Sequence, residues 1–381
     1  MRAYAAVILG LLLLLPGRSA AQTSDADFRI RLIGRIQAQF NSTSVDEAEL
    51  VAAGLNPQPI PATNFDIRRL RFGAELEYDK WLTGKIEVEM AMARLQMRDV
   101  FVNFGFDPAL NLRVGQFKKP YSLLQLYSSS MWPVIERGVL IRGITDAMLH
   151  ADSTTAGGRL LSSFRGVPVL PEEQALLEVF GYQNFDLGAA VHGKIGGFGY
   201  SAGLFNGAGS DRPDDTNAQS YAARITYKLP TDLPITLGSA LSHRNYRVSN
   251  RPTIQTNSGT AYEFDVEVGA FRGHGLHILG EVAFGENLAV ADDDFLGGQA
   301  IVAWFQPIND SRIEGVEVAG RASYGDPRRD FDDDGGWFYT PGVNLYFSGR
   351  NRLMFNWDVF APKAERFDSE NAVRIQAQVY F

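Results

Sequence analysis

Hydrophobic and polar residues alternate one by one along most of the chain after residue 27. In the stretch FRIRLIGRIQAQF, which begins at Phe28, apolar side chains and one glycine occupy the even positions, and arginines and glutamines occupy most of the odd ones. The same period of two appears in RRLRFGAELEY, KIEVEMAM, YEFDVEVGAF and RLMFNWDVF. This alternation is typical of a β-strand with one apolar and one polar face. The pattern therefore predicts an all-β protein.

The segments between these stretches alternate between short and long. The short ones are DKWLTG, DPAL, IGGF, PTDLP, RGHG, PINDS and SGRN, and the long polar ones cover residues 41–63, 118–184, 207–217, 248–260, 286–297, 325–336 and 361–371. Short turns on one side and long loops on the other are typical of outer-membrane β-barrels. We predict sixteen antiparallel transmembrane strands, centred near residues 34, 72, 89, 101, 113, 190, 202, 224, 241, 266, 280, 302, 318, 342, 356 and 376. A soluble β-sandwich or solenoid is the alternative, but a sandwich of this size has strand edges to protect, whereas a closed barrel has none.

The chain ends inside one of these alternating stretches, NAVRIQAQVYF. Lipid offers no hydrogen-bond partner to a backbone, so we expect this last strand to pair and close the barrel. Outer-membrane barrels commonly end in a phenylalanine that the assembly machinery reads. This habit makes Phe381 the predicted membrane-insertion signal and the barrel-assembly machinery a predicted partner.

The first 21 residues have the form of a secretory signal peptide. Arg2 precedes an apolar run too short to span a bilayer, and Ser19 and Ala21 occupy the small-residue positions of a cleavage site. We predict export and cleavage after Ala21, which leaves residues 22–381 as one barrel domain in the outer membrane of a Gram-negative cell. That domain has 34 basic and 44 acidic residues, and an acidic balance argues against a nucleic-acid partner. The chain has no cysteine, so disulfides cannot stabilise it, and no motif calls for a cofactor.

Three stretches carry a family resemblance: NFDIRRLRFGAELEYDKWLTGKIEVEMA, MRDVFVNFGFDPALNLRVGQFKKPYSLLQLYSSS and VIERG. Together they resemble the phosphate-selective porin O/P family, and the match is densest over residues 64–137. The resemblance implies a trimeric 16-stranded porin whose long loop, here 118–184, folds inward and constricts the pore. It also implies small anionic solutes such as phosphate as cargo, and outer-membrane lipids and lipopolysaccharide as surroundings.

Basic residues with the parity of the polar face are candidate anion-binding and pore-lining residues. Arginine offers a fixed fork of donors that suits phosphate oxygens. On the first strands the candidates are Arg29, Arg31, Arg35, Arg69, Arg71 and Lys85. Arg68 has the opposite parity, so it faces the lumen only if a β-bulge intervenes. The inward loop that the resemblance implies adds Lys118, Lys119, Ser128, Ser129 and Arg137.

Acidic residues leave the ion preference open at this point. Glu75, Glu77, Glu87 and Glu89 share strands with the arginines, and Glu263, Asp265 and Glu267 line another wall. Mixed charge is common in porin lumens, so we expect an anion channel but keep a second hypothesis, a barrel for an oligosaccharide or surface polymer. Such a channel usually has an aromatic track, for which Phe101, Phe117, Tyr121 and Tyr127 are the inward candidates.

Two other kinds of site have weaker support. Asp330, Asp332 and Asp334 match the opening of a calcium loop, but Pro341 stands where a bidentate glutamate belongs, so we expect a solvated acidic loop. A barrel phospholipase would need a paired serine and histidine near the outer rim, and no motif places one. We therefore predict a channel and not an enzyme.

Overall fold

The computed structural model describes most of the predicted barrel domain. The described residues are 28–44, 63–79, 81–91, 94–137, 176–212, 214, 216, 218–248, 255–288, 293–330, 335–363 and 369–381. The predicted signal peptide and its cleavage site lie outside them. None of the helices among these residues is long and apolar enough to cross a membrane.

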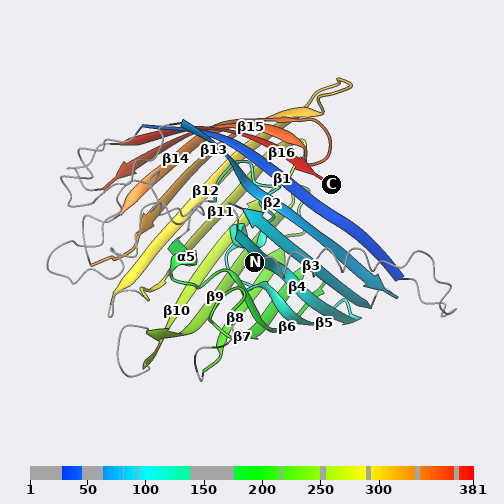
Figure 1. The fold of residues 1–381 in the computed structure, drawn as a ribbon, viewed down its shortest axis with the longest axis vertical. Helices are drawn as coiled ribbons and strands as arrows, with labels where there is room; N and C mark the ends of the chain where they lie inside the picture. Colours follow the sequence, from blue (N-terminus) through cyan, green and yellow to red (C-terminus); the bar gives the residue numbers. More distant parts are fainter. Residues whose placement is uncertain are drawn as a thin grey trace.

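Sixteen strands make up nearly all of the regular structure in the described part of the chain (Figure 1). They are β1 (Phe28–Ser44), β2 (Thr63–Tyr78), β3 (Leu82–Ala91), β4 (Arg94–Asp107), β5 (Leu110–Lys118), β6 (Phe185–Ile195), β7 (Phe198–Phe205), β8 (Ser220–Lys228), β9 (Ile235–Val248), β10 (Gln255–Val268), β11 (Gly275–Glu286), β12 (Asp294–Pro307), β13 (Gly315–Asp326), β14 (Gly336–Tyr346), β15 (Arg352–Pro362) and β16 (Glu370–Tyr380). Each strand pairs antiparallel with the next, and β16 pairs with β1, so the sheet is a closed barrel. The predicted fold class and strand number are confirmed.

Several strands extend further than their alternation predicted. β1 continues to Ser44 and β10 begins at Gln255, although segments 41–63 and 248–260 were predicted to be loops. β3 ends at Ala91 and β4 begins at Arg94, so the connection between them is short. It was not among the predicted connections. Polar residues continue the pairing because ladder hydrogen bonds do not require an apolar face. Hydropathy alone therefore marks the membrane-embedded part of a strand better than its end.

The two faces of each strand differ as the sequence pattern predicts. Along β12, Val302 and Trp304 are exposed on the outer face, whereas Ile301 and Ala303 are buried on the inner face. Aromatic rings gather on the outside, where Trp337 and Tyr339 stack. Outer aromatics of this kind form the interfacial girdles of membrane barrels.

A β-bulge in β2 reverses the parity of one arginine. In the pairing of β1 with β2, Gln37 lies opposite Arg69 and Ala38 lies opposite Ile67, so Arg68 is an extra residue. The extra residue lets Arg68 and Arg69 both point inward, and both side chains are buried.

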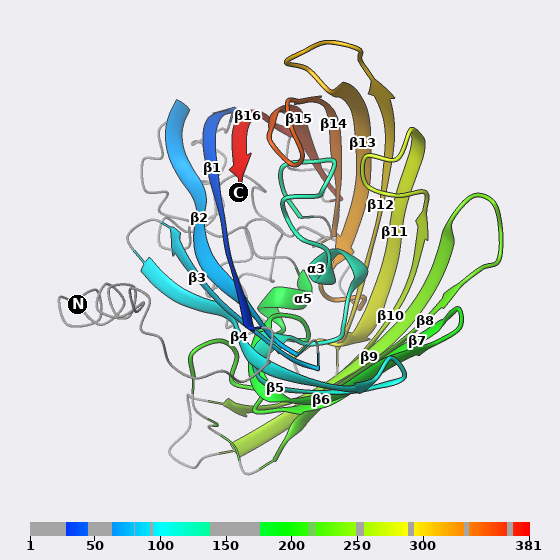
Figure 2. The same cartoon turned by 90° about the vertical axis from the view of Figure 1, so that its right-hand side faces the viewer.

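The long connection between β5 and β6 enters the barrel at both of its described ends (Figure 2). Helix α3 (Leu123–Leu126) packs against Leu279 and Ile301 of the inner wall. Helix α5 (Leu176–Val179) belongs to a cluster with Phe295 and other inner-face residues. Residues 138–175 lie outside the described part, so the constriction of the pore by the whole loop 118–184 stays a prediction.

Candidate functional site

A cavity of about 380 Å³, called the central cavity below, lies inside the barrel between β1–β5 and the inserted segment 119–137. Its charged lining, among the described residues, consists of eight basic and three acidic side chains. The basic ones are Arg31, Arg35, Arg71, Lys85, Arg113, Lys118, Arg137 and Arg350, and the acidic ones are Glu75, Glu87 and Asp99. The lining is therefore strongly cationic, although the chain as a whole is acidic.

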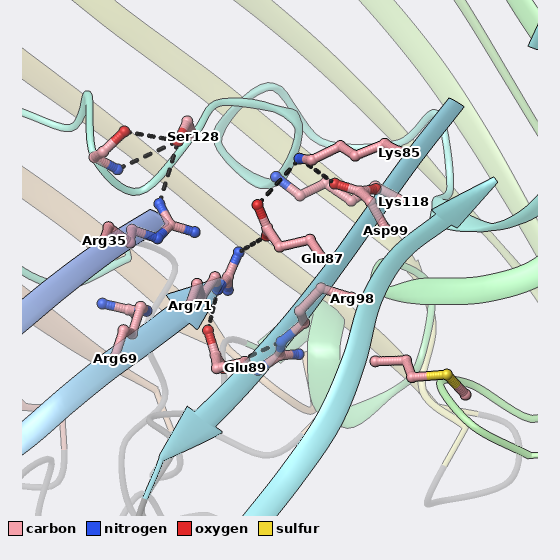
Figure 3. Close-up of polar contacts among 12 residues, drawn as sticks. Arg35, Arg69, Arg71, Lys85, Glu87, Glu89, Arg98, Asp99, Lys118 and Ser128 are labelled. Carbon is pink, nitrogen blue, oxygen red and sulfur yellow. Dashed lines mark hydrogen bonds and ion pairs between the residues drawn. The ribbon is translucent and has the colours of Figure 1, made fainter. Parts of the chain in front are cut away.

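Each acid of this lining has a basic partner close by, and Figure 3 shows those of Glu87 and Asp99. Glu87 accepts hydrogen bonds from Arg71, at 3.0 Å, and forms an ion pair with Lys85, at 3.1 Å. The ammonium group of Lys85 also donates to Asp99, at 2.9 Å. Glu75 is paired with Arg31 on the neighbouring strand. The carboxylates thus compensate part of the positive charge and leave an excess of it.

Four of the cations form no ion pair with a carboxylate within the described ranges, although Asp99 lies close enough to Lys118 and Arg113 to attract them. The guanidinium group of Arg35 donates to Ser128 Oγ, at 3.3 Å, and that of Arg350 donates to Ser130 Oγ, at 3.2 Å. Lys118 donates to the backbone carbonyl of Gln125, at 2.6 Å. These neutral partners hold the side chains in place without cancelling their charge.

Arg113 is the fourth of these cations, and it stands where three cavities meet. Its guanidinium carbon lies 4.3 Å from the ring centroid of Phe101 and 5.5 Å from that of Phe117. Besides the central cavity, it lines a second one of about 380 Å³ beside β5–β8 and one of about 770 Å³ on the side of the short turns. The linings of all three cavities thus share the guanidinium group of Arg113.

The structure gathers most of the predicted pore residues at the central cavity, and it places four elsewhere. Arg31, Arg35, Arg71, Lys85, Lys118, Ser128, Ser129 and Arg137 line the cavity. Arg68 instead donates two hydrogen bonds to Glu136, at 2.9 and 3.0 Å. Arg69 donates to Gln37, at 3.1 Å, and its guanidinium group lies 3.9 Å from Glu136. Neither of these two arginines is among the residues that line the cavity.

Arg29 and Lys119 belong to opposite ends of the lumen. Arg29 lines the large cavity on the side of the short turns. Lys119 lines a cavity of about 270 Å³ near the long loops and donates to the carbonyl of Gly181. Burial lowers the pKa of Lys119 to about 8, although the nearby carboxylate of Asp186 opposes this shift.

Two of the basic residues that line the cavity, Arg113 and Arg350, were not among the candidates from the sequence. Arg113 has the parity of the polar face, so counting along β5 was enough to find it. Arg350 lies in the short turn after β14, and no periodicity predicts that a turn residue reaches Ser130 inside the barrel. Its position depends on where the inserted segment meets the wall.

The predicted membrane-insertion signal lies away from the lumen. Phe381 is on the outer face, where its ring lies 6.1 Å from that of Phe72. Asp330 is described, but Asp332 and Asp334 lie outside the described residues, so the calcium loop stays untested. Across the described ranges, no group of three or more His, Asp or Glu side chains could hold a metal ion.

Sequence comparison identifies the family of this barrel. Residues 56–262, more than half of the 381, match the sequence profile of the family described as phosphate-selective porin O and P. The chain belongs to this family. No curated protein matches the chain.

Solved structures support the fold of this porin. DcaP, an outer-membrane channel of Acinetobacter baumannii, is 11% identical, with a TM-score of 0.59 over 95% of this chain and 100% of DcaP. The trimer form of OmpT from Vibrio cholerae is 13% identical, with a TM-score of 0.56 over 93% of this chain and 99% of OmpT. OprB of Pseudomonas putida is 9% identical, with a TM-score of 0.56 over 92% and 94% of the two chains. At such low identity the likeness shows the porin fold alone.

Proposed function

We propose that this porin is a passive outer-membrane channel that prefers small anions, in particular oxyanions such as phosphate. The central cavity supports this preference most strongly, because eight basic side chains surround it and its three acids are all paired. The field inside a narrow channel is set by such local charges and not by the net charge of the chain. The net charge of −8 is therefore compatible with an anion channel.

An anion that enters the cavity exchanges part of its hydration shell for guanidinium and ammonium donors. Arg35 and Arg113 offer N–H groups in a fixed planar arrangement, which suits the oxygens of a phosphate. The donors come from separate strands and are held by neutral groups, so each binds an anion weakly. Several weak sites in series allow release as well as entry, which passive conduction requires.

The alternative, a barrel for an oligosaccharide, lacks its usual feature. Phe117 and Tyr121 are buried, and Phe101 lies against the guanidinium group of Arg113. Tyr127 donates its hydroxyl group to Glu267 on the wall. The four inward aromatic candidates are therefore engaged with protein groups and form no open track in the described part of the lumen.

We also propose a homotrimer that is inserted by the barrel-assembly machinery and surrounded by lipopolysaccharide. The family resemblance supports the trimer, and one of its fold neighbours, OmpT, is known in a trimer form. A band that migrates as an oligomer before boiling and as a monomer afterwards would support this assembly. Identical mobility with and without boiling would contradict it.

Competition between solutes tests the proposed cargo. Single-channel recordings in potassium chloride should show a lower chloride current after phosphate is added on one side, because phosphate occupies the same donors. A neutral oligosaccharide at the same concentration is the control and should leave the current unchanged. A current that responds to the oligosaccharide and not to phosphate would favour the alternative.

A further inference from the structure

The wall opposite the basic strands carries a cluster of carboxylates on its inner face. Glu263 and Asp265 belong to β10, and Glu281 belongs to β11. Exposed carboxylates at these positions would attract cations and offset the positive field of β1–β5. None of the three is among the residues that line the central cavity.

Residues Pro120–Tyr127, which belong to the inserted segment 119–137, cover Glu263 and Glu281 of this cluster. The backbone N–H of Leu123 donates to Glu263 Oε1, at 3.1 Å, and the backbone N–H of Leu124 donates to Glu281 Oε2, at 3.1 Å. The hydroxyl group of Ser122 donates to the same oxygen of Glu281, at 2.9 Å. As a result, Glu263 is 0% exposed and Glu281 is 7% exposed.

The wall itself occupies the remaining oxygens of the cluster. Arg224 donates to Glu263 Oε2, at 2.9 Å, and to Asp265 Oδ1, at 2.8 Å. Gln299 donates to Glu281 Oε1, at 2.6 Å. Donors therefore reach Glu263 and Glu281 from both sides, and the inserted segment supplies the side that faces the lumen.

Apolar contacts explain why the segment stays on this wall. Leu123 and Leu124 pack against Leu279, Ile301 and Ala303, which form an apolar patch on the inner face of β11 and β12. Inner faces of porin strands are ordinarily polar, so such a patch needs an apolar cover. The patch lies beside the carboxylates, and one segment therefore covers both.

Ser122 adopts a strained backbone conformation that lets its hydroxyl group contact this wall. Its φ of 66° lies in the left-handed region, which non-glycine residues rarely adopt. In this conformation its hydroxyl group contacts Glu281 and also accepts a hydrogen bond from the backbone N–H of Gln125. Ser122, the residue with the strained backbone, is thus the first residue of this segment to bond to one of the carboxylates.

We propose that Pro120–Tyr127 determines the ion preference by covering the carboxylates of β10 and β11, which makes Ser122, Leu123 and Leu124 specificity-determining residues although none is charged. This role rests on the proposed anion preference and adds to it. A loop that only narrows the pore would change conductance when it is displaced. A loop that covers carboxylates also changes which ion passes.

Reversal potentials of four forms of the full-length protein test the proposal in planar bilayers under a potassium chloride gradient. The forms are the wild type, L123S/L124S, E263Q/E281Q, and the combination of all four changes. Loss of the leucine contacts should release the segment and lower the chloride-to-potassium permeability ratio by about threefold or more, since the carboxylates then face the pore. E263Q/E281Q should leave the wild-type ratio unchanged, yet restore it in the combined form.

Two outcomes would overturn the proposal. One is an unchanged permeability ratio in L123S/L124S together with a higher conductance, which indicates a purely steric loop. The other is a higher chloride preference in E263Q/E281Q alone, which indicates that the carboxylates already face the pore. A wild type that prefers potassium would instead contradict the proposed function.

A second comparison does not depend on how well the released loop folds. Glu87 lines the central cavity and Glu281 is covered, so E87Q should raise the chloride preference and E281Q should not. Equal effects of E87Q and E281Q would overturn the proposal. The oligomer band before boiling serves as the check that both variants assemble.

Discussion

Gly34 and Phe381 exchange both of their backbone hydrogen bonds, with N···O distances of 2.8 and 3.0 Å. The pairing of β1 with β16 therefore extends to the last residue of the chain. The ring of Phe381 occupies the space where any other residue at position 34 would place its Cβ atom. Gly34 thus contributes both to the pairing that closes the barrel and to the space that the ring of Phe381 occupies.

Gly34→Ala should reduce the amount of assembled porin, because a Cβ atom at this position collides with the ring of Phe381. Deletion of Phe381 should have the same effect, and the conductance of the assembled fraction should stay normal in both variants. Gly320→Ala is the matched control, since its Cβ atom would have no neighbour within 4 Å. The oligomer band before boiling measures assembly, and normal abundance of both the Gly34 and Phe381 variants would contradict a role in closure.

The pair formed by Arg68 and Glu136 should fix the end of the inserted segment. Both side chains are buried, and removal of one partner from such a pair typically costs about 3–5 kcal/mol. Glu136→Gln should therefore lower the temperature at which the oligomer band is lost. A double change of Arg68→Met and Glu136→Leu should recover part of the loss, and equal temperatures for all forms would show that the pair is not structural.

Lys119 should make the outer mouth of the channel sensitive to alkaline pH. Its pKa of about 8 lies below the ordinary value of 10.5, so the folded protein loses this charge in a pH range where a free lysine keeps it. Chloride preference should fall as the pH rises from about 7 to 9, because a cation near the long loops becomes neutral. Lys119→Met should remove this step, and an identical pH profile in the variant would assign the step to another group.

Arg113 should contribute more to chloride selectivity than Arg31. Arg113 forms no ion pair in the described part of the barrel and lines three cavities, whereas Arg31 is exposed and forms an ion pair with Glu75. Arg113→Gln should lower the chloride-to-potassium permeability ratio by about two- to fivefold at 0.1 M salt and by less at 1 M, where screening is stronger. An equal or larger effect of Arg31→Gln would contradict this ranking.

Parity along the strands predicted the faces of the barrel, but not the partners of its charges. Arg71 and Glu87 were both assigned to the polar face, and both lie there. In the register of β2 with β3, Arg71 lies opposite Glu89 and diagonally from Glu87, and it bonds to both. The alternation of residues does not specify this register. For this reason the sequence left the net charge of the pore open.

Irregular features were the hardest to predict. The sequence does not specify the bulge at Arg68, because one extra residue reverses parity without any change in composition. In the sequence, Leu279 and Ile301 cannot be told apart from other apolar strand residues, so the apolar patch that they form on the inner face is not predicted. Only the folded structure shows that Leu123 and Leu124 pack against this patch and cover it.

The reversal potential of the wild-type porin in a tenfold potassium chloride gradient tests the anion preference most directly. Because basic side chains dominate the central cavity, chloride should be more permeant than potassium, and the reversal potential should have the sign of the chloride equilibrium potential. Arg113→Glu combined with Lys118→Glu should shift it toward potassium, and Arg329→Glu, on an exposed outer segment, should not. A wild-type potential of the sign set by potassium, or no shift in the double variant, would contradict an anion-selective channel.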